Sequence, residues 1–514
     1  MPCFRRSRRF GSFVPAPNSD PIMAILSIVA TSCLPGRYIE KSSDEASSIL
    51  RRKNGKAVAV LQPKALRISP AGLRGIVGRG LTAAHVLDFA AAFGTFLERG
   101  RPVLLGRDPR ASGVMIREGV IAGLLASGHD VVDLGIVSTP VIQHAIRRME
   151  AGGGVSIGAS HNRAEWNALK FFGPRGTYLS TAESGELLDI YHLRKFTLTP
   201  WNSLGRLHVE DGALDAYLDT LASVFDFAAL RSFRVVVDCC NGTSGLILRR
   251  LNERFGFQFI LINERMEGVE FAHEPLTNSR TVSLQLAPLI RPLGADAGFL
   301  FDVDSDRVAI ATDEGEPLSE EMALPMLADF MLPRGPGKIV ITNLSTTALV
   351  DEIAAWHGGK VVRVPVGRQA TIDALAAYRP EQVALAGEGT GAVMMPQFRF
   401  VYDGIASMFA ILSMMRERGQ KLSEIVAGYP RYSILKGELP LVSKQIPALL
   451  MELQQKNASG RINVSDGLRV DWPDRWFHVR VSQTEPVVRV ICEQRGEPPT
   501  ALFESLLDKV RSLS

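Results

Sequence analysis

Cysteine is scarce in this sequence. The 514 residues include only five cysteines, an odd number without CxxC spacing. This excludes a disulfide framework and a zinc site of the common kind, and it predicts reduced thiols in a cytoplasmic protein. The five are Cys3, Cys33, Cys239, Cys240 and Cys492.

The sequence also lacks long apolar runs and a strong net charge. No apolar stretch reaches the roughly 18 residues of a membrane span, so we expect no membrane partner. The net charge is only +4, and no basic stripe is interleaved with aromatics, so we expect no nucleic-acid partner. With 46% hydrophobic and 22% charged residues the chain is globular, and its length predicts three or four domains at roughly 150 residues each.

Residues 1–65 differ in composition from the rest. MPCFRRSRRF is arginine-rich without an acid, and a short apolar stretch, Met23–Leu34, follows. A targeting segment is one interpretation. We favour a disordered extension, or a start assigned too far upstream with Met23 as the first residue.

From Leu66 onward, strand and helix patterns alternate. Val103–Gly106 is followed by a helical pattern at Val114–Ser127 and a second strand pattern at Val131–Leu134. This alternation predicts a parallel, wound sheet. Similar α/β units follow up to about residue 430, whereas 431–514 contains alternating strand-like runs and a closing helix.

The chemistry is concentrated around Ser160. This serine follows an apolar strand pattern and is followed by His161, Asn162 and, ten positions on, Lys170. A hydroxyl with an imidazole, an amide and an ammonium nearby suits a nucleophile that handles an anionic group. The alternative is an ordinary turn in which Ser160 and Asn162 satisfy backbone groups.

Two arginine-bearing stretches suit phosphate. Arg74 lies between two glycines, where the backbone can approach a ligand, although such sequences also form ordinary turns. Near the C-terminus, Arg480 and Arg489 enclose a short loop with the hydroxyls of Ser482 and Thr484. Paired arginines, hydroxyls and backbone amides make a phosphate cradle.

Asp302, Asp304 and Asp306 alternate at the end of an apolar strand pattern. Three adjacent carboxylates repel one another unless a cation lies between them, and oxygen ligands alone indicate Mg²⁺. An EF-hand is excluded because Arg307 and Asp313 occupy its glycine and glutamate positions. An aspartyl phosphatase using Asp302 and a solvated acidic turn remain alternatives.

Glu388 and Thr390 alternate with three glycines in Gly387–Gly391. A carboxylate and a hydroxyl in such a loop suit the hydroxyls of a sugar. A plain glycine-rich turn remains the alternative.

These four stretches, in this order, resemble the α-D-phosphohexomutase superfamily over residues 66–514. The family's serine loop TASHNP matches Gly158–Arg163, and its metal loop DGDxDR matches Asp302–Arg307. Its sugar loop GExSG matches Gly387–Gly391, and its phosphate loop RxSGTEPxxR matches Arg480–Arg489.

The resemblance implies an α/β fold of four domains around a central cleft. Three related α/β domains with mixed sheets are expected at 66–205, 206–316 and 317–430, carrying the phosphoserine, metal and sugar loops. A smaller C-terminal α+β domain with the phosphate loop is expected at 431–514.

The resemblance also implies a function. A phosphosugar mutase would interconvert a hexose 1-phosphate and 6-phosphate, with glucosamine phosphate first and mannose or glucose phosphate next. It would use Mg²⁺ and a hexose 1,6-bisphosphate activator, as a cytoplasmic monomer or homodimer. In such an enzyme Ser160 would carry the phosphoryl group, and it would bind the metal together with Asp302, Asp304 and Asp306. The implied catalytic residues are His161, Lys170 and Arg74. The implied substrate-binding residues are Arg307, Glu388, Thr390, Arg480, Ser482, Thr484 and Arg489.

Several positions depart from the family pattern. Arg163 replaces a proline and would add a candidate phosphate contact, and Val303 replaces a glycine in the metal loop, so that the turn must accept a side chain. Thr390, Gln483 and Ala392 are further departures. We interpret the chain as an active, divergent member. A catalytically silent sugar-phosphate-binding paralogue is the alternative.

Overall fold

The computed structural model describes residues 51–53, 56–58, 65–70, 72–396, 400–440, 445–482 and 487–513. Most of the predicted N-terminal extension therefore lies outside the described residues. Within it, β1 (Arg51–Lys53) and β2 (Lys56–Val58) pair antiparallel. They belong to a compact unit, residues 1–61, separate from the unit formed by 62–514.

The first sheet of the larger unit has seven strands in the order β3-β4-β8-β7-β5-β6-β9. Strand β5 pairs in parallel with β6 and β7, whereas β8 is antiparallel to β7. The strands are β3 (Leu66–Ser69), β4 (Gly72–Ile76), β5 (Val103–Arg107), β6 (Val131–Ile136), β7 (Gly153–Ile157), β8 (Trp166–Phe172) and β9 (Leu207–Val209).

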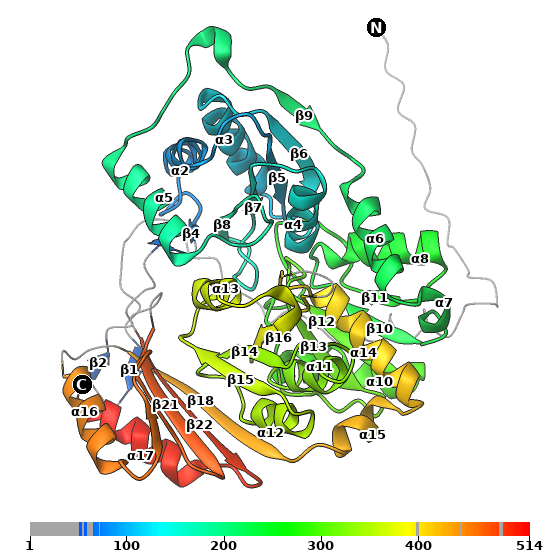
Figure 1. Ribbon diagram of the computed structural model, residues 1–514, viewed down its shortest axis with the longest axis vertical. Helices are drawn as coiled ribbons and strands as arrows, with labels where there is room; N and C mark the ends of the chain where they lie inside the picture. The colour runs from blue at the N-terminus through cyan, green and yellow to red at the C-terminus, as the bar shows by residue number, and fades with distance from the viewer. Residues whose placement is uncertain are drawn as a thin grey trace, which may run out of the picture. The chain divides into compact units, whose positions relative to one another are not determined.

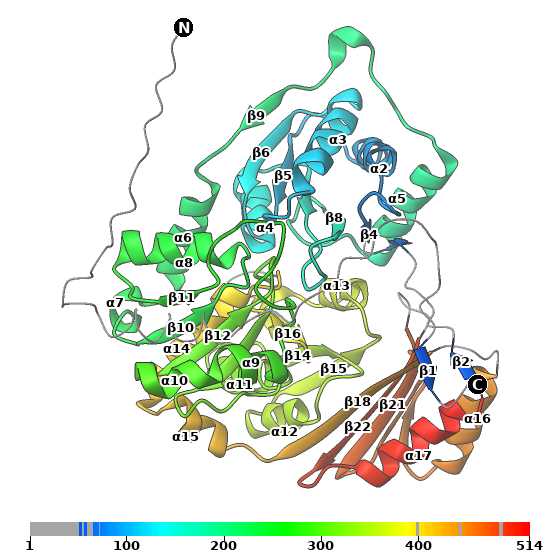
Figure 2. The ribbon, with the colours of Figure 1, turned by 180° about the vertical axis from the view of Figure 1, so that it is seen from behind.

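Helices cover both faces of this sheet, because side chains of a buried strand alternate between two cores. On β5, Val103 and Leu105 pack with one hydrophobic core and Leu104 with the other. The helices are α2 (Ala83–Phe96), α3 (Gly113–Ala126), α4 (Thr139–Arg148) and α5 (Thr181–Leu193) (Figures 1 and 2). Strand β9 pairs with β6, so the predicted boundary at 205/206 cuts a strand off the first sheet.

The second and third sheets share one topology. Their orders are β11-β10-β12-β13 and β15-β14-β16-β17, and in each the last strand is antiparallel to its neighbour while the other pairs are parallel. The strands are β10 (Val235–Asp238), β11 (Ile260–Ile262), β12 (Ala297–Phe301), β13 (Val308–Thr312), β14 (Ile339–Asn343), β15 (Lys360–Val364), β16 (Val383–Glu388) and β17 (Ala392–Met394). Their helices are α6 (Ala213–Val224), α7 (Phe227–Leu230), α8 (Ser244–Phe255), α9 (Ser279–Gln285), α10 (Ala287–Leu293), α11 (Ala323–Met331), α12 (Leu349–Trp356), α13 (Arg368–Ala376), α14 (Gly404–Arg418) and α15 (Leu422–Ala427).

One connection recurs in all three sheets and positions the chemistry. It joins a parallel strand to an antiparallel neighbour: β7 to β8, β12 to β13, and β16 to β17. The serine loop, the aspartate loop and the glutamate loop are these three connections.

The last sheet is antiparallel throughout and has its own core. Its order is β18-β22-β21-β20-β19, and α16 and α17 contact it. The predicted fold class, three α/β domains with mixed sheets and a smaller α+β domain, is confirmed. The elements are β18 (Tyr432–Pro440), α16 (Ile446–Lys456), β19 (Arg461–Asn463), β20 (Leu468–Asp471), β21 (Arg475–Val481), β22 (Val487–Arg495) and α17 (Thr500–Arg511).

The described cysteines, Cys239, Cys240 and Cys492, are buried free thiols. Among the described residues, no helix combines the length and apolarity that crossing a membrane requires.

Candidate active site

Ser160 adopts a backbone conformation that is unusual for a serine. Its φ is +50°, in the left-handed region, and its side chain is buried. Such a conformation persists only where the surroundings hold it. The fully buried Arg110 does so: its guanidinium donates to the carbonyls of Ser160 at 3.0 Å, Asn162 at 2.7 Å and Trp166 at 3.1 Å.

Arg110 is itself fixed by Asp108, whose carboxylate accepts from the Arg110 Nε at 2.8 Å. The backbone of the serine loop at Gly158 is closely packed against Asp108 and Asp304. A Cβ on Gly158 would lie 2.7 Å from an Asp304 oxygen and 2.8 Å from an Asp108 oxygen, so the loop needs glycine there.

The Ser160 hydroxyl donates directly to the Asp302 carboxylate, and His161 Nδ1 lies 3.4 Å from the same hydroxyl oxygen. Asp302, Asp304 and Asp306 are all buried in the β12–β13 loop. The structure therefore joins the predicted nucleophile to the predicted metal loop, across 142 positions of sequence.

Two cations neutralise part of this carboxylate cluster. Lys170 contacts Asp304 and lies 3.8 Å from Asp306, while Arg368 donates to Asp306 at 2.9 Å. Burial alone would lower the pKa of Lys170, but Asp304 and other neighbours outweigh it and leave the pKa raised. Burial would raise the pKa of Asp306, but Arg368 and Lys170 lower it overall.

Asp302 carries the uncompensated charge of the cluster. Its burial, together with the charges of Asp306 and Asp304, raises its pKa to about 8. Its Oδ1 accepts only a 3.3 Å hydrogen bond from the backbone of Arg307.

The donor set fits a divalent cation. All side-chain donors are oxygens, a negative charge on Asp302 is disfavoured without a cation, and no described residue forms a hydrogen bond with the buried Asp306 Oδ1. Among the described residues, however, no three His, Cys, Asp or Glu side chains already converge on one point, because Lys170 and Arg368 engage two of the aspartates.

The departures from the family pattern have simple structural outcomes here. Val303 is buried at a negative φ, and Ser305 adopts the left-handed conformation instead, with φ +60°. The turn therefore accepts the valine. The phosphate contact of Arg163 stays a prediction: this 70% exposed side chain pairs with Glu274 and does not line the pocket described below.

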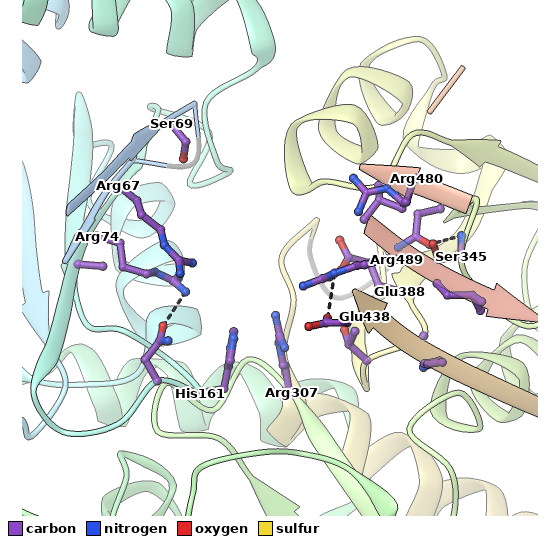
Figure 3. Close-up of a pocket in the computed structure, with 18 of the residues that line it drawn as sticks. Arg67, Ser69, Arg74, His161, Arg307, Ser345, Glu388, Glu438, Arg480 and Arg489 are labelled. Atoms are coloured by element: carbon purple, nitrogen blue, oxygen red, sulfur yellow. Dashed lines mark hydrogen bonds and ion pairs between the residues drawn. The ribbon is translucent and has the colours of Figure 1, made fainter. Parts of the chain in front are cut away.

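A pocket of about 620 Å³ opens beside the serine loop. On one wall, Arg74 on β4 donates to the Asn162 side chain at 2.8 Å, and His161 and Arg307 lie between the two walls (Figure 3). Burial and nearby arginines, first Arg307, lower the pKa of His161 well below its usual value. The imidazole is therefore neutral at pH 7 and can accept a proton.

The glutamate loop lies on the opposite side. Glu388, the last residue of β16, accepts from the Tyr402 hydroxyl at 3.1 Å, and the buried Thr390 hydroxyl has no partner among the residues that the structure describes. A Cβ at Gly389 would lie 1.9 Å from a carboxylate oxygen of Glu321. The glycine thus admits Glu321, which pairs with Lys436 at 2.7 Å at the edge of the pocket.

The last sheet completes this wall. Arg480 on β21 is held by Asp466 at 2.8 Å, and Arg489 on β22 pairs with Glu438 at 3.0 Å (Figure 3). The Ser345 hydroxyl lies 3.0 Å from Nδ1 of His478.

His478 orients that hydroxyl. Its Nε2 donates to the Asp466 carbonyl at 2.6 Å, which leaves Nδ1 to accept from Ser345. Burial lowers the pKa of His478 to about 4, so the ring stays neutral. The Ser345 oxygen is therefore free to accept a hydrogen bond, and it lies on the same pocket wall as the guanidinium groups of Arg480 and Arg489.

Most predicted site residues line this pocket, but the predicted nucleophile, Ser160, does not. Ser160 and the three aspartates lie buried directly behind it, and Ser482 is buried outside its lining. Thr484 and Gln483 lie outside the described residues. The predicted residues that line the pocket are Arg74, His161, Lys170, Arg307, Glu388, Thr390, Arg480 and Arg489.

Sequence reasoning missed four contributors. Arg110, Ser345 and Arg368 all follow strand ends, where open α/β sheets bind ligands, but no individual role was predicted for them. Lys436 lies within β18, where no sequence signal marked it.

Comparison with known families matches three domain models along the chain. They are phosphoglucomutase/phosphomannomutase α/β/α domain I at residues 68–197, domain II at 215–315 and domain III at 320–432. These spans follow the first three sheets in order.

Relatives match nearly the whole larger unit. A phosphoglucomutase/phosphomannomutase of Thermococcus kodakarensis is 32% identical over 434 residues, which is 83% of this chain and 94% of the relative. A protein named probable phosphoglucosamine mutase of Pyrococcus abyssi is 33% identical over 447 residues, 86% of this chain and 96% of the relative.

Solved structures share the fold. A phosphoglucomutase/phosphomannomutase family protein of Burkholderia thailandensis aligns with TM-score 0.73 at 24% identity, covering 87% of this chain and 97% of that chain. An N-acetylphosphoglucosamine mutase of Aspergillus fumigatus, in complex with GlcNAc-6P and magnesium, aligns with TM-score 0.55 at 15% identity, covering 87% and 95%. By its three domain matches and its full-length relatives, the chain belongs to the α-D-phosphohexomutase superfamily, a group of isomerases that act as intramolecular phosphotransferases.

Proposed function

We propose that this enzyme interconverts the 1-phosphate and 6-phosphate of a hexose, with glucosamine phosphate as the first candidate substrate. The observation that carries the proposal is the position of Ser160: its hydroxyl contacts a buried carboxylate cluster behind a pocket whose far wall presents two arginines. The name of the Pyrococcus relative favours glucosamine phosphate over mannose and glucose phosphate.

In the proposed cycle, Ser160 carries a phosphoryl group. The serine O–P bond breaks as a sugar hydroxyl forms a new P–O bond, the hydroxyl proton passes to a base, and the departing serine oxygen takes up a proton. His161 is the candidate base, because its lowered pKa leaves it neutral and its ring lies beside the serine oxygen. The product is a hexose bisphosphate, which returns its other phosphoryl group to Ser160 after turning over.

The charges around Ser160 support such a transfer, since phosphoryl transfer depends mainly on positioning and on neutralising charge. Lys170 and Arg307 line the pocket beside the serine loop, and Arg74 holds the loop through Asn162. The phosphorylated Ser160, Asp302, Asp304 and Asp306 would hold Mg²⁺, which supplies further neutralisation of the phosphoryl oxygens. The Aspergillus enzyme was solved in complex with magnesium, which supports this choice of cation.

The far wall is proposed to hold the sugar and its unreactive phosphate. Glu388 and the unpartnered Thr390 hydroxyl suit sugar hydroxyls. Arg480 and Arg489, together with Ser482 and Thr484, suit a phosphate held in either orientation of the sugar. A hexose 1,6-bisphosphate is then the expected activator, because it phosphorylates Ser160 at the start.

A ³¹P NMR assay tests the proposal. Purified protein with Mg²⁺ and a trace of glucose 1,6-bisphosphate is given glucosamine, glucose and mannose 1-phosphates in turn. We expect one 1-phosphate to become its 6-phosphate, with the activity lost in Ser160→Ala. The matched control is Ser156→Ala, which changes a buried serine on β7 whose hydroxyl lies 3.1 Å from that of Thr139, outside the pocket lining.

Two other outcomes would redirect the assignment. Release of inorganic phosphate that survives Ser160→Ala would favour an aspartyl phosphatase using Asp302. Binding of a hexose phosphate without turnover of any sugar would favour a silent sugar-phosphate-binding paralogue.

A further inference from the structure

A second cavity, of about 380 Å³, lies outside the active-site pocket and shares none of its lining residues. It is formed where α4 and the turn after β8 meet α13 and the segment before α14. Its volume is within the range of small-molecule sites, which is about 300–1,000 Å³. Its lining includes Arg147, Arg175, Ile372, Leu375, Tyr378 and Phe400.

The chemistry of this cavity is specific. Its floor is apolar, with Ile372 and Leu375 buried, and two aromatic side chains stand at its side. Arg147 and Arg175 add two guanidinium groups, and the described part of the chain places no acidic side chain in contact with either. An apolar cavity with two unpaired guanidinium groups is complementary to an anion that carries an apolar body.

The segments that carry the two exposed arginines are joined to each other. The Gln143 side chain on α4 donates to the Gly176 carbonyl at 2.9 Å and so ties the turn that carries Arg175 to the helix that carries Arg147. A Cβ at Gly176 would lie 3.3 Å from the Arg147 stem, so glycine lets that stem pack against the turn.

Three lining segments lead directly to Arg368 in the active site. Thr177 precedes Tyr178, whose ring centroid lies 4.8 Å from the Arg368 guanidinium carbon. Val401 precedes Tyr402, whose ring lies 5.5 Å from the same carbon.

The third segment is α13 itself. It begins at Arg368, which binds Asp306, and one turn later Ile372 lines the cavity. A ligand that packs against these segments would therefore change the position of Arg368, and with it the charge balance at Asp306.

We propose that this cavity binds an organic anion with an apolar body, and that its occupancy regulates the enzyme through Arg368. The proposal that the cavity binds an anion does not depend on the proposed function. The proposal that binding changes the rate rests on the proposed function.

Binding is tested with anilinonaphthalenesulfonate, an aromatic anion whose fluorescence rises in apolar sites. The enzyme is first saturated with inorganic phosphate and a hexose phosphate to occupy the active-site pocket. In the double variant Arg147→Gln, Arg175→Gln we expect the Kd of the probe to rise about tenfold or more, because two charge-assisted contacts are lost. The control is Arg148→Gln, an exposed neighbour on α4 outside the cavity lining, which should leave the Kd unchanged.

The role of charge has its own control. Phenylnaphthylamine has the same aromatic body without the sulfonate, and we expect it to bind at least about tenfold more weakly than the anion. Equal binding of the two probes, or equal binding of the anion to the wild type and the double variant, would overturn the site.

Coupling to Arg368 is measured by hydrogen exchange, which does not require activity. Bound probe should slow amide exchange in α13 at least twofold in the wild type but not in the double variant, and turnover of the hexose phosphate should change by at least twofold. Basal turnover of the double variant should equal that of the wild type. Probe binding with unchanged α13 exchange and unchanged turnover would overturn the regulatory part.

Discussion

The base and the far wall of the active-site pocket hold charge in different ways. At the base, Lys170 and Asp304 are 3% and 2% exposed, and Asp304 and Asp306 each depend on a particular cation. The far wall holds both kinds of pair: Arg480 and Asp466 are 4% and 9% exposed, whereas Arg489 and Glu438 are 34% and 54% exposed, so that water can replace either partner of the second pair. Buried charges lose much of their solvation, so their partners determine both stability and reactivity, whereas exposed pairs contribute little to stability.

This difference matches the proposed division of labour. The base must keep a serine, carboxylates and a phosphoryl group in one fixed arrangement. The far wall must accept a sugar phosphate in two orientations, which the more open Arg489 permits. Four variants test this contrast, from the largest expected effect to the smallest.

Lys170→Met should show the largest effect. It removes the cation from Asp304 and leaves a buried carboxylate unpaired, so the free energy of unfolding should fall by about 3–5 kcal/mol. Urea denaturation measures this. Lys421→Met, at a 72% exposed lysine, is the control and should change it by less than about 0.5 kcal/mol. If the free energy of unfolding of Lys170→Met fell by less than about 1 kcal/mol, the buried ion pair at the base would not differ in strength from the exposed pairs.

Arg110→Gln should affect turnover more than binding. The variant loses the hydrogen bonds that Arg110 donates to the carbonyls of the serine loop, and these bonds hold Ser160 in its left-handed conformation. We therefore expect kcat to fall about 100-fold with KM nearly unchanged. Steady-state kinetics on the preferred hexose phosphate would show this. Arg163→Gln is the matched control on the same loop, where an exposed arginine is lost and kcat should remain within about threefold. An equal effect of the two variants would contradict the positioning role of Arg110.

His478 should make stability depend on pH. Its folded-state pKa is about 4, below the usual value of 6.5, so the stabilisation is present above pH 6.5 and is lost as the pH falls towards 4. At about 1.4 kcal/mol per pKa unit, the loss reaches about 3 kcal/mol. Denaturation at pH 7, 6, 5 and 4 should show a smaller fall in His478→Asn than in the wild type. Parallel pH profiles for the two proteins would show that this ring does not titrate as described.

Arg489→Gln should have the smallest effect on stability. Because its ion pair with Glu438 is partly exposed, the free energy of unfolding should change by less than about 1 kcal/mol. Loss of one charge-assisted phosphate contact should raise KM about 10- to 100-fold. Denaturation and kinetics on one preparation would separate the two effects. A large loss of stability with unchanged KM would make this arginine structural.

Part of the site was predictable because it is local in sequence. Ser160, the three aspartates and Glu388 each follow an apolar strand, and short-range patterns reveal such strand ends. Arg368 could not be assigned in this way, since its partners Tyr178 and Asp306 come from other loops. The partner of Arg163 could not be assigned for the same reason, because Glu274 lies on a distant segment.

The sequence by itself indicated the α/β alternation and the chemical content of each loop, since these follow from periodicity and neighbouring residue types, whereas the number and order of the domains were implied by the family resemblance of the motifs. Only the tertiary structure decided that the serine hydroxyl meets Asp302, 142 positions away. The physical reason is that the three loops occupy the same connection in three sheets, and the packing of those sheets against one another brings the loops together. That packing also places Arg110 and Arg368 against the loops, and no local pattern records it.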